Sequence, residues 1–315
     1  MNFNQLRYFI ELVRHKSFTE SAKVLDITQP ALSLQIQKLE EEYDFTLIDR
    51  TKKPLSLTEE GEIFYEKALQ IVQLVDDLDQ LSLDMENKVE GTLRVGIIPT
   101  LSPYLAPLFI DRLKEKYPGL KINIVELKTE DIMSQLTHNE IDLGIISTPV
   151  KAKNIGFIPL FYERFYLYIS EKHPLYVADE IDLKDLNMDE LWYLHEGNCF
   201  QNQVNSVCQM SNQDKDELPF NYMSNSIESL KRIVENQGGL TFIPELATSN
   251  IPAEYESMIK DIASPIPTRE ISAAYLKTTG LKKTAQVFLD VMSDNIPARM
   301  KEKPAHLPLD TKIRL

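Results

Sequence analysis

The first sixty residues alternate apolar and polar positions with the period of short helices. Over residues 4–14 the apolar side chains recur three and four positions apart, at Leu6, Phe9, Ile10 and Val13. A second helix is predicted over 18–25 and a third from Thr28, which can cap it with Pro30 in its first turn. Two short helices joined by a three-residue turn predict a helix-turn-helix, whose second helix enters the major groove of DNA. A helical hairpin that binds a protein, or binds nothing, has the same spacing.

The second helix of this motif and a hairpin after it carry side chains suited to DNA. Glutamine can bond adenine through two hydrogen bonds, and serine can contact bases or phosphate. A hairpin predicted over 47–58 brings basic residues to where a wing would meet phosphates. The predicted DNA-contacting residues are Gln29, Pro30, Ser33, Gln37, Arg50, Lys52 and Lys53.

A long helix is predicted to follow from residue 59. Its apolar positions alternate four and three apart over about three heptads, at Phe64, Ala68, Ile71, Val75, Leu78, Ser82 and Met85. Such a seam favours a dimer, because a helix that reads one groove gains affinity from a partner on a second half-site. The alternative is an amphipathic helix that packs on its own domain.

From residue 91 onward, strand patterns alternate with helix patterns. Strands are predicted over 92–97, 121–126, 141–147, 163–169, 220–223, 240–243 and 270–275, and helices over 105–116, 131–139, 226–237 and 284–296. The alternation predicts an α/β fold with a mostly parallel sheet. Ligands of such sheets lie beyond the carboxyl ends of the strands, which puts Thr100 and Thr129 at a cleft.

These patterns divide the chain into three parts. A winged helix-turn-helix is predicted over 1–58, a linker helix over 59–90 and an effector domain over 91–315, with one lobe at about 91–162 and 266–300 and a second at about 163–265.

Charge is distributed unevenly along the 315 residues. The net charge is −14, yet residues 1–58 hold eight basic and eight acidic side chains. A neutral module can bind DNA if its basic residues share one face, so charge neither supports nor excludes that function.

No apolar run approaches the roughly 18 residues of a membrane span, and the N-terminus does not resemble a signal peptide, so we expect a cytoplasmic protein without a membrane partner. Without a dinucleotide, P-loop, HExxH or GxSxG motif, and with five scattered histidines, we expect no enzyme, no cofactor and no metal site.

The two cysteines, Cys199 and Cys208, are too few for a disulfide scaffold. The residues after Asn198 predict a short helix with Asn198 as its cap and Cys199 as its first residue, where the helix dipole lowers the pKa of a thiol. Nine helical residues rise about 13 to 14 Å, whereas a disulfide needs Cα atoms within about 7 Å. A bond between them would therefore require the helix to unwind. The alternative is two structural cysteines that never meet.

The N-terminal residues are similar to those of a known family. The segment at 18–61 reads FTESAKVLDITQPALSLQIQKLEEEYDFTLIDRTKKPLSLTEEG. It closely resembles the DNA-binding signature of LysR-type regulators, although Lys53-Pro54 stands where that family often carries Arg-Lys. The resemblance implies a two-lobed, periplasmic-binding-protein-like effector domain, promoter DNA as partner, and dimers that assemble into tetramers.

Four effector segments resemble the peroxide-sensing members of that family: GIIPTLSPYLAP, LHEGNC followed by a cysteine nine residues on, SNSIESLKRIVENQGGLTFIP and TREI. The resemblance implies that hydrogen peroxide oxidises Cys199 and that Cys208 then closes a disulfide, which activates antioxidant genes. It implies a peroxide pocket formed by Thr100, Thr129, Asn198 and Arg269. RNA polymerase and a thiol reductant, glutaredoxin or thioredoxin, are implied as partners.

Two positions depart from the peroxide-sensing pattern. Asn198 stands where that family usually has histidine, and Gln201 where it has arginine. Both changes remove positive charge near Cys199, so we expect a less acidic thiol and slower oxidation. Two other functions remain: a LysR-type regulator whose cleft binds a small organic anion, with incidental cysteines, and a thiol peroxidase that turns over catalytically.

Overall fold

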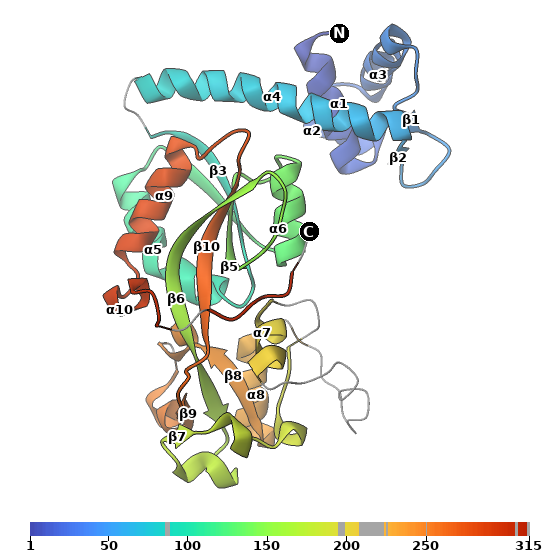
Figure 1. Ribbon diagram of the computed structural model, residues 1–315. Helices are drawn as coiled ribbons and strands as arrows, with labels where there is room; N and C mark the ends of the chain where they lie inside the picture. Colours follow the sequence, from blue (N-terminus) through green and yellow to red (C-terminus); the bar gives the residue numbers. More distant parts are fainter. Residues whose placement is uncertain are drawn as a thin grey trace. The chain divides into compact units, whose positions relative to one another are not determined.

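The computed structural model describes residues 1–85, 89–194, 199–207, 224, 226–249, 251–305 and 308–313 (Figure 1). The chain forms two compact units, residues 1–88 and 89–315. In the described ranges no helix has the length and apolar character needed to cross a membrane. The predicted strand at 220–223 lies outside these residues.

The N-terminal unit confirms the predicted winged helix-turn-helix. Its elements are α1 (Phe3–His15), α2 (Phe18–Val24), α3 (Gln29–Tyr43), β1 (Ile48–Asp49), β2 (Ser56–Leu57) and α4 (Glu59–Met85). Polar side chains begin the first three helices: Asn2 and Ser17 cap α1 and α2, and Thr28 Oγ1 accepts a hydrogen bond from Ala31 N at 3.4 Å. β1 and β2 pair antiparallel, which makes the wing.

Helix α4 completes the core of this unit. Its first turns bury Tyr65, Ala68 and Leu69 against the apolar side of α1 and α3. A methyl group added at Gly61 would lie 2.1 Å from the Leu47 carbonyl oxygen, so glycine is needed where α4 approaches the chain before β1. Thr58 Oγ1 caps the helix by accepting from Gly61 N at 2.9 Å.

The predicted seam of α4 divides into two parts. Phe64 and Ala68 pack into the unit's own core. This part of α4 therefore behaves as an amphipathic helix that packs on its own domain, which was the alternative to a dimer seam. Farther along the helix, Ile71, Leu74 and Leu78 are 39%, 64% and 68% exposed. The first turns of α4 thus pack in the core of its own unit, and its later turns expose apolar side chains to solvent.

The C-terminal unit is an α/β fold, as predicted. Its main elements are β3 (Gly91–Ile97), α5 (Ser102–Lys116), β4 (Leu120–Glu126), α6 (Thr129–Thr137), β5 (Leu143–Thr148), β6 (Ile155–Ile169), β7 (Glu180–Ile181), α7 (Cys199–Val207), α8 (Ile227–Gln237), β8 (Leu240–Pro244), β9 (Ile259–Ile262), β10 (Thr268–Leu276), α9 (Lys283–Asp294) and α10 (Ala298–Lys301). Figure 1 shows α5 and α9 on one side of the central strands and α6 on the other.

The prediction of a mostly parallel sheet is wrong. The strand order is β4-β3-β5-β10-β6-β9-β7, with β8 also on β6. β3 pairs parallel with β4 and β5, but β10 runs antiparallel to both β5 and β6, and β6 runs antiparallel to β8 and β9. The alternation of strands with helices along the chain does not reveal that a late strand, β10, inserts between two earlier ones.

Strand β6 is about twice as long as the predicted strand at 163–169. It begins at Ile155 and contains Pro159, a residue that argues against a strand interior because it lacks an N–H donor. The register against β10 shifts between Ile271 and Ser272, opposite Phe161 and Pro159. This irregularity accommodates the proline, so β6 and β10 form one continuous pair along the unit.

An ion cluster joins the start of the unit to its end. Arg94 binds both carboxylate oxygens of Asp142 at 3.0 Å, and Lys282 Nζ donates to Asp142 Oδ1 at 3.0 Å. Burial raises the pKa of Asp142, but the contacts with Arg94 and Lys282 outweigh it and hold that pKa below its ordinary value.

Asp142→Asn should therefore lower the free energy of unfolding of this unit at pH 7 by about 2 kcal/mol. The unfolded pKa of aspartate is about 3.9, so the carboxylate's contribution is complete above that pH and is lost as pH falls through the lower folded value. Urea unfolding followed by fluorescence of Trp192, the single tryptophan, measures this. A difference between wild type and variant that stays constant from pH 7 to pH 3 would contradict it.

Candidate DNA-binding and redox sites

The start of α3 presents the residues predicted to read DNA. Gln29 and Pro30 are exposed, and Ser33 is half-buried one turn later. Gln37 is also exposed, and its Nε2 donates to Glu41 Oε1 at 2.9 Å. The apolar stripe of Leu32, Ile36 and Leu39 faces the core. The four predicted residues are therefore accessible on one helix.

Hydrogen bonds to Glu40 of α3, a residue that sequence reasoning missed, hold the wing against that helix. Glu40 Oε1 accepts from Leu47 N at 2.9 Å and Ile48 N at 3.2 Å, and Glu40 Oε2 accepts from Arg50 Nη2 at 2.7 Å. Arg50 also lies over the ring of Phe18, 5.5 Å from its centroid. Arg50 is thus engaged within the protein. Lys52 lies 3.6 Å from Asp49, and both Lys52 and Lys53 are exposed.

In the C-terminal unit, Thr100 and Thr129 lie at the same edge of the sheet. Each follows the end of one of two neighbouring parallel strands, β3 and β4, which end with Ile97 opposite Glu126. Both threonines are buried, and Thr129 is the first residue of α6. The structure therefore places both threonines beyond the carboxyl ends of neighbouring strands, and a ligand cleft at this edge stays a prediction.

Arg269 and Glu163 form a fully buried ion pair beside Thr100. Arg269 Nη2 lies 2.7 Å from Glu163 Oε2, and Arg269 Nη1 donates to Thr100 Oγ1 at 3.0 Å. Glu163 Oε1 accepts from Leu246 N at 3.0 Å. Sequence reasoning named Arg269 but missed Glu163, because these residues are 106 positions apart and meet only where β10 pairs with β6.

Helix α7 packs directly on this ion pair. The Arg269 guanidinium lies 5.1 Å from the centroid of the Phe200 ring, and Phe200 stacks on Phe165 with centroids 4.7 Å apart. Cys199 is the first residue of α7, as predicted, and directly precedes Phe200. Asn198 and Cys208 lie outside the described residues, as does the Cys199 side chain. The structure thus joins Thr100, Arg269 and the start of α7.

Gln201, one of the two departures from the family pattern, is buried and makes hydrogen bonds in both directions. Its Oε1 accepts from Leu194 N at 2.8 Å, and its Nε2 donates to Asn205 Oδ1 at 2.7 Å. A neutral amide therefore ties the chain before Cys199 to the helix that follows it.

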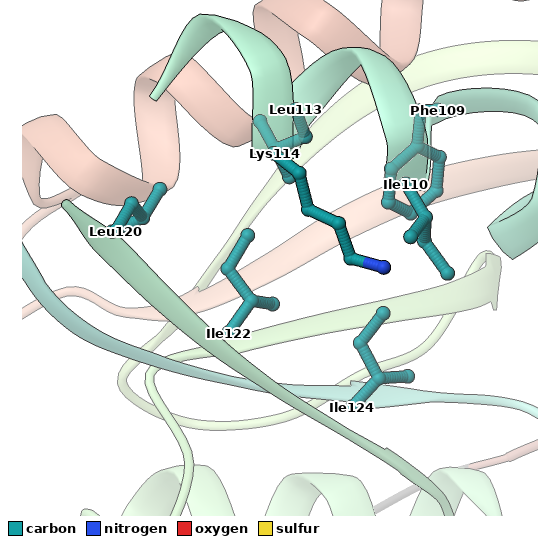
Figure 2. A pocket seen from close by; sticks show the side chains of 7 residues that line it. All are labelled: Phe109, Ile110, Leu113, Lys114, Leu120, Ile122 and Ile124. Atoms are coloured by element: carbon teal, nitrogen blue, oxygen red, sulfur yellow. The ribbon is translucent and has the colours of Figure 1, made fainter. Parts of the chain in front are cut away.

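A cavity of about 400 Å³ lies between α5 and β4, and none of its lining residues belongs to the sites above (Figure 2). Its lining is apolar apart from Lys114, and consists of Phe109, Ile110, Leu113, Lys114, Leu120, Ile122 and Ile124. β4 is the edge strand of the sheet. Across the part of the chain that the structure covers, no three His, Cys, Asp or Glu side chains gather as a metal site would require.

Two family models match the chain. One, described as "LysR substrate binding domain", matches residues 86–297, and the other, "Bacterial regulatory helix-turn-helix protein, lysR family", matches residues 3–62. The chain therefore belongs to the LysR family.

Within this family, the chain is similar over nearly its whole length to regulators named for hydrogen peroxide. The chain is 29% identical to the "Hydrogen peroxide-inducible genes activator" of Haemophilus influenzae, over 94% of this chain and 97% of that protein. It is 28% identical to the "DNA-binding transcriptional dual regulator OxyR" of Escherichia coli K12, over 95% and 96%. Among solved structures it is similar to full-length OxyR from Pseudomonas aeruginosa, with a TM-score of 0.78, 27% identity and 93% and 98% coverage.

The buried ion pair yields a stability prediction. Glu163→Gln leaves the Arg269 charge buried without a counter-ion and should lower the free energy of unfolding by about 3 to 5 kcal/mol. The double variant Glu163→Met with Arg269→Met should cost less than the single variant, because it buries no charge. Urea unfolding monitored at Trp192 measures both. A double variant less stable than Glu163→Gln would contradict this account.

Proposed function

We propose that this chain is a peroxide-sensing transcription regulator that binds promoter DNA and switches by joining Cys199 to Cys208. The observation that carries the proposal is the position of Cys199, the first residue of a short helix that packs on the Arg269–Glu163 pair next to Thr100. The printed names of the relatives, activators of hydrogen peroxide-inducible genes, support the same function over nearly the whole chain.

The N-terminal unit binds DNA through α3 and the wing. Gln29 and Ser33 reach base edges, while Lys52 and Lys53 contact phosphates. Arg50 supports the wing through Glu40 and Phe18, and its side chain is still 42% exposed, which allows a phosphate contact. The regulator acts in the cytoplasm, where it meets both DNA and RNA polymerase.

The redox step proceeds through two displacements. The Cys199 thiolate attacks one peroxide oxygen, the O–O bond breaks, and the departing hydroxide takes a proton and leaves as water. Cys199 is then a sulfenic acid, which the Cys208 thiol attacks to form the disulfide and release a second water. Thr100 and Thr129 hold the peroxide, and Asn198 and Arg269 complete the polar pocket. A thiol reductant such as glutaredoxin or thioredoxin restores both thiols.

Helix geometry makes this bond a conformational switch. Eight steps of about 1.5 Å separate the Cα atoms of Cys199 and Val207 by about 12 Å, and one further peptide spans about 3.8 Å. Helix α7 therefore keeps the two cysteine Cα atoms beyond the roughly 7 Å that a disulfide tolerates. Oxidation requires α7 to unwind, and the disulfide then stores the altered fold.

Two apolar surfaces support assembly into dimers and tetramers. The exposed Ile71, Leu74 and Leu78 of α4 form one surface, and the cavity between α5 and β4 forms another. Because they lie on different units of the chain, each can pair two copies independently.

Stoichiometric hydrogen peroxide should convert the reduced protein into a form with one Cys199–Cys208 bond and no free thiol. Cys208→Ser should stop at a sulfenic acid, and Cys199→Ser should keep its remaining thiol. Intact mass and thiol counts measure these states. Persistence of both wild-type thiols at micromolar peroxide would overturn the sensor and leave a LysR-family regulator with a small-molecule inducer.

Base reading by α3 can be tested with a DNA site that the wild-type protein selects from a random library, by measuring the affinity of variants for this site and for unrelated DNA. Gln29→Ala should weaken binding to the selected site by about tenfold, the loss of one base contact. It should leave binding to unrelated DNA unchanged. Lys52→Gln should weaken both and lower the slope of log affinity against log salt by about 1. Gln70→Ala, exposed on α4, is the control. Equal loss of specific and non-specific affinity in Gln29→Ala would contradict base reading.

A further inference from the structure

The last described segment of the chain, residues 308–313, lies beyond the end of the matched family model at residue 297. Hydrogen bonds nevertheless hold this segment against the rest of the C-terminal unit. Leu309 N donates to Thr268 O at 2.9 Å, Thr311 Oγ1 donates to Pro149 O, and Lys151 N donates to Ile313 O at 3.5 Å. Thr311 is fully buried and Ile313 is 5% exposed. The segment therefore packs across the ends of β5 and β10.

Helix α7 binds the backbone of this segment through two amide side chains. Asn202 Nδ2 donates to Thr311 O at 3.1 Å, and Gln203 Nε2 donates to Leu309 O at 3.0 Å. Gln203 is fully buried and also bonds Ser147 Oγ of β5, at 3.2 Å. Figure 1 shows the end of the chain passing next to α7 after α10.

These hydrogen bonds belong to the helical form of α7. Asn202 and Gln203 lie between the two cysteines, in the stretch that must unwind before the Cα atoms can approach to disulfide distance. Unwinding moves both amides away from Leu309 O and Thr311 O. It also leaves the buried Gln203 amide and the part-buried carbonyl oxygens of Leu309 and Thr311 without these partners, which costs free energy.

We propose that residues 308–313 act as a latch that holds α7 in its reduced, helical form and so sets how readily the Cys199–Cys208 bond forms. Asn202 and Gln203 are positioning residues in this mechanism, because they touch neither sulfur nor peroxide in the proposed reaction. The latch rests on the proposed redox function. It opposes oxidation thermodynamically, since its bonds stabilise the dithiol state and are lost in the disulfide state.

The test compares wild type with Asn202→Ala, Gln203→Met and the double variant. Ser206→Ala is the matched control, because Ser206 lies on α7 and its Oγ donates to Asn202 O within the helix. The readouts are the dithiol–disulfide equilibrium in glutathione buffers and the rate of disulfide formation after peroxide. Losing one latch bond should favour the disulfide by about tenfold, the equivalent of a reduction potential about 30 mV more negative.

A second measurement reports the latch without any redox step. In the reduced proteins, hydrogen exchange of the α7 backbone amides should be faster in Asn202→Ala and Gln203→Met than in Ser206→Ala. Thermal unfolding confirms that each variant is folded.

The outcomes separate the latch from the redox function. If wild type forms the disulfide and the variants match Ser206→Ala in potential and in exchange, the latch is overturned while the sensor stands. If wild type forms no disulfide, the proposed function fails and the latch fails with it. A more negative potential together with faster exchange in the variants supports the latch.

Discussion

The ion pair between Arg269 and Glu163 is the constraint around which the C-terminal unit is arranged. Two fully buried charges are tolerated only when each is matched and hydrogen-bonded. Here the guanidinium meets the Glu163 carboxylate, the Thr100 hydroxyl and the Phe200 ring, while the carboxylate also accepts from Leu246 N. The pair joins β10 to β6, and through these contacts it fixes both the loop after β3 and the first turn of α7.

Because Phe200 of α7, Thr100 and Glu163 all contact the same Arg269 guanidinium, α7 is coupled to the sheet. A shift of α7 moves Phe200 away from the Arg269 guanidinium, and a shift of β10 moves Arg269 away from Thr100. The start of α7, where Cys199 lies, and the long β6–β10 pair are therefore linked through a single side chain. In the proposed function, this linkage gives the oxidation of Cys199 a route into the core of the unit.

Much of the architecture could be predicted from local pattern. The cap at Thr28, the buried stripe of α3 and the alternation of strands and helices follow from nearest-neighbour physics, so those elements were predicted closely. The failures have a common cause. The length of β6, the insertion of β10 and the partner Glu163 depend on contacts between residues far apart in sequence. Glu40 contacts the nearby wing, but through side-chain hydrogen bonds that no periodic pattern encodes. The predicted roles of Thr100, Thr129, Arg269 and the cysteines rest on resemblance, which the structure complements by showing Thr100, Arg269 and the start of α7 in contact.

The central position of β10 also governs how this protein is made. A ribosome delivers the chain from its N-terminus, so the DNA-binding unit can fold while the rest is still being synthesised. The effector sheet cannot close in the same way. β5 and β6 emerge long before residues 268–276, the strand that must lie between them. Until that strand arrives, both present unpaired strand edges, which are templates for association with other chains. The nascent effector unit is thus most vulnerable to aggregation in the interval between the synthesis of β6 and the arrival of β10.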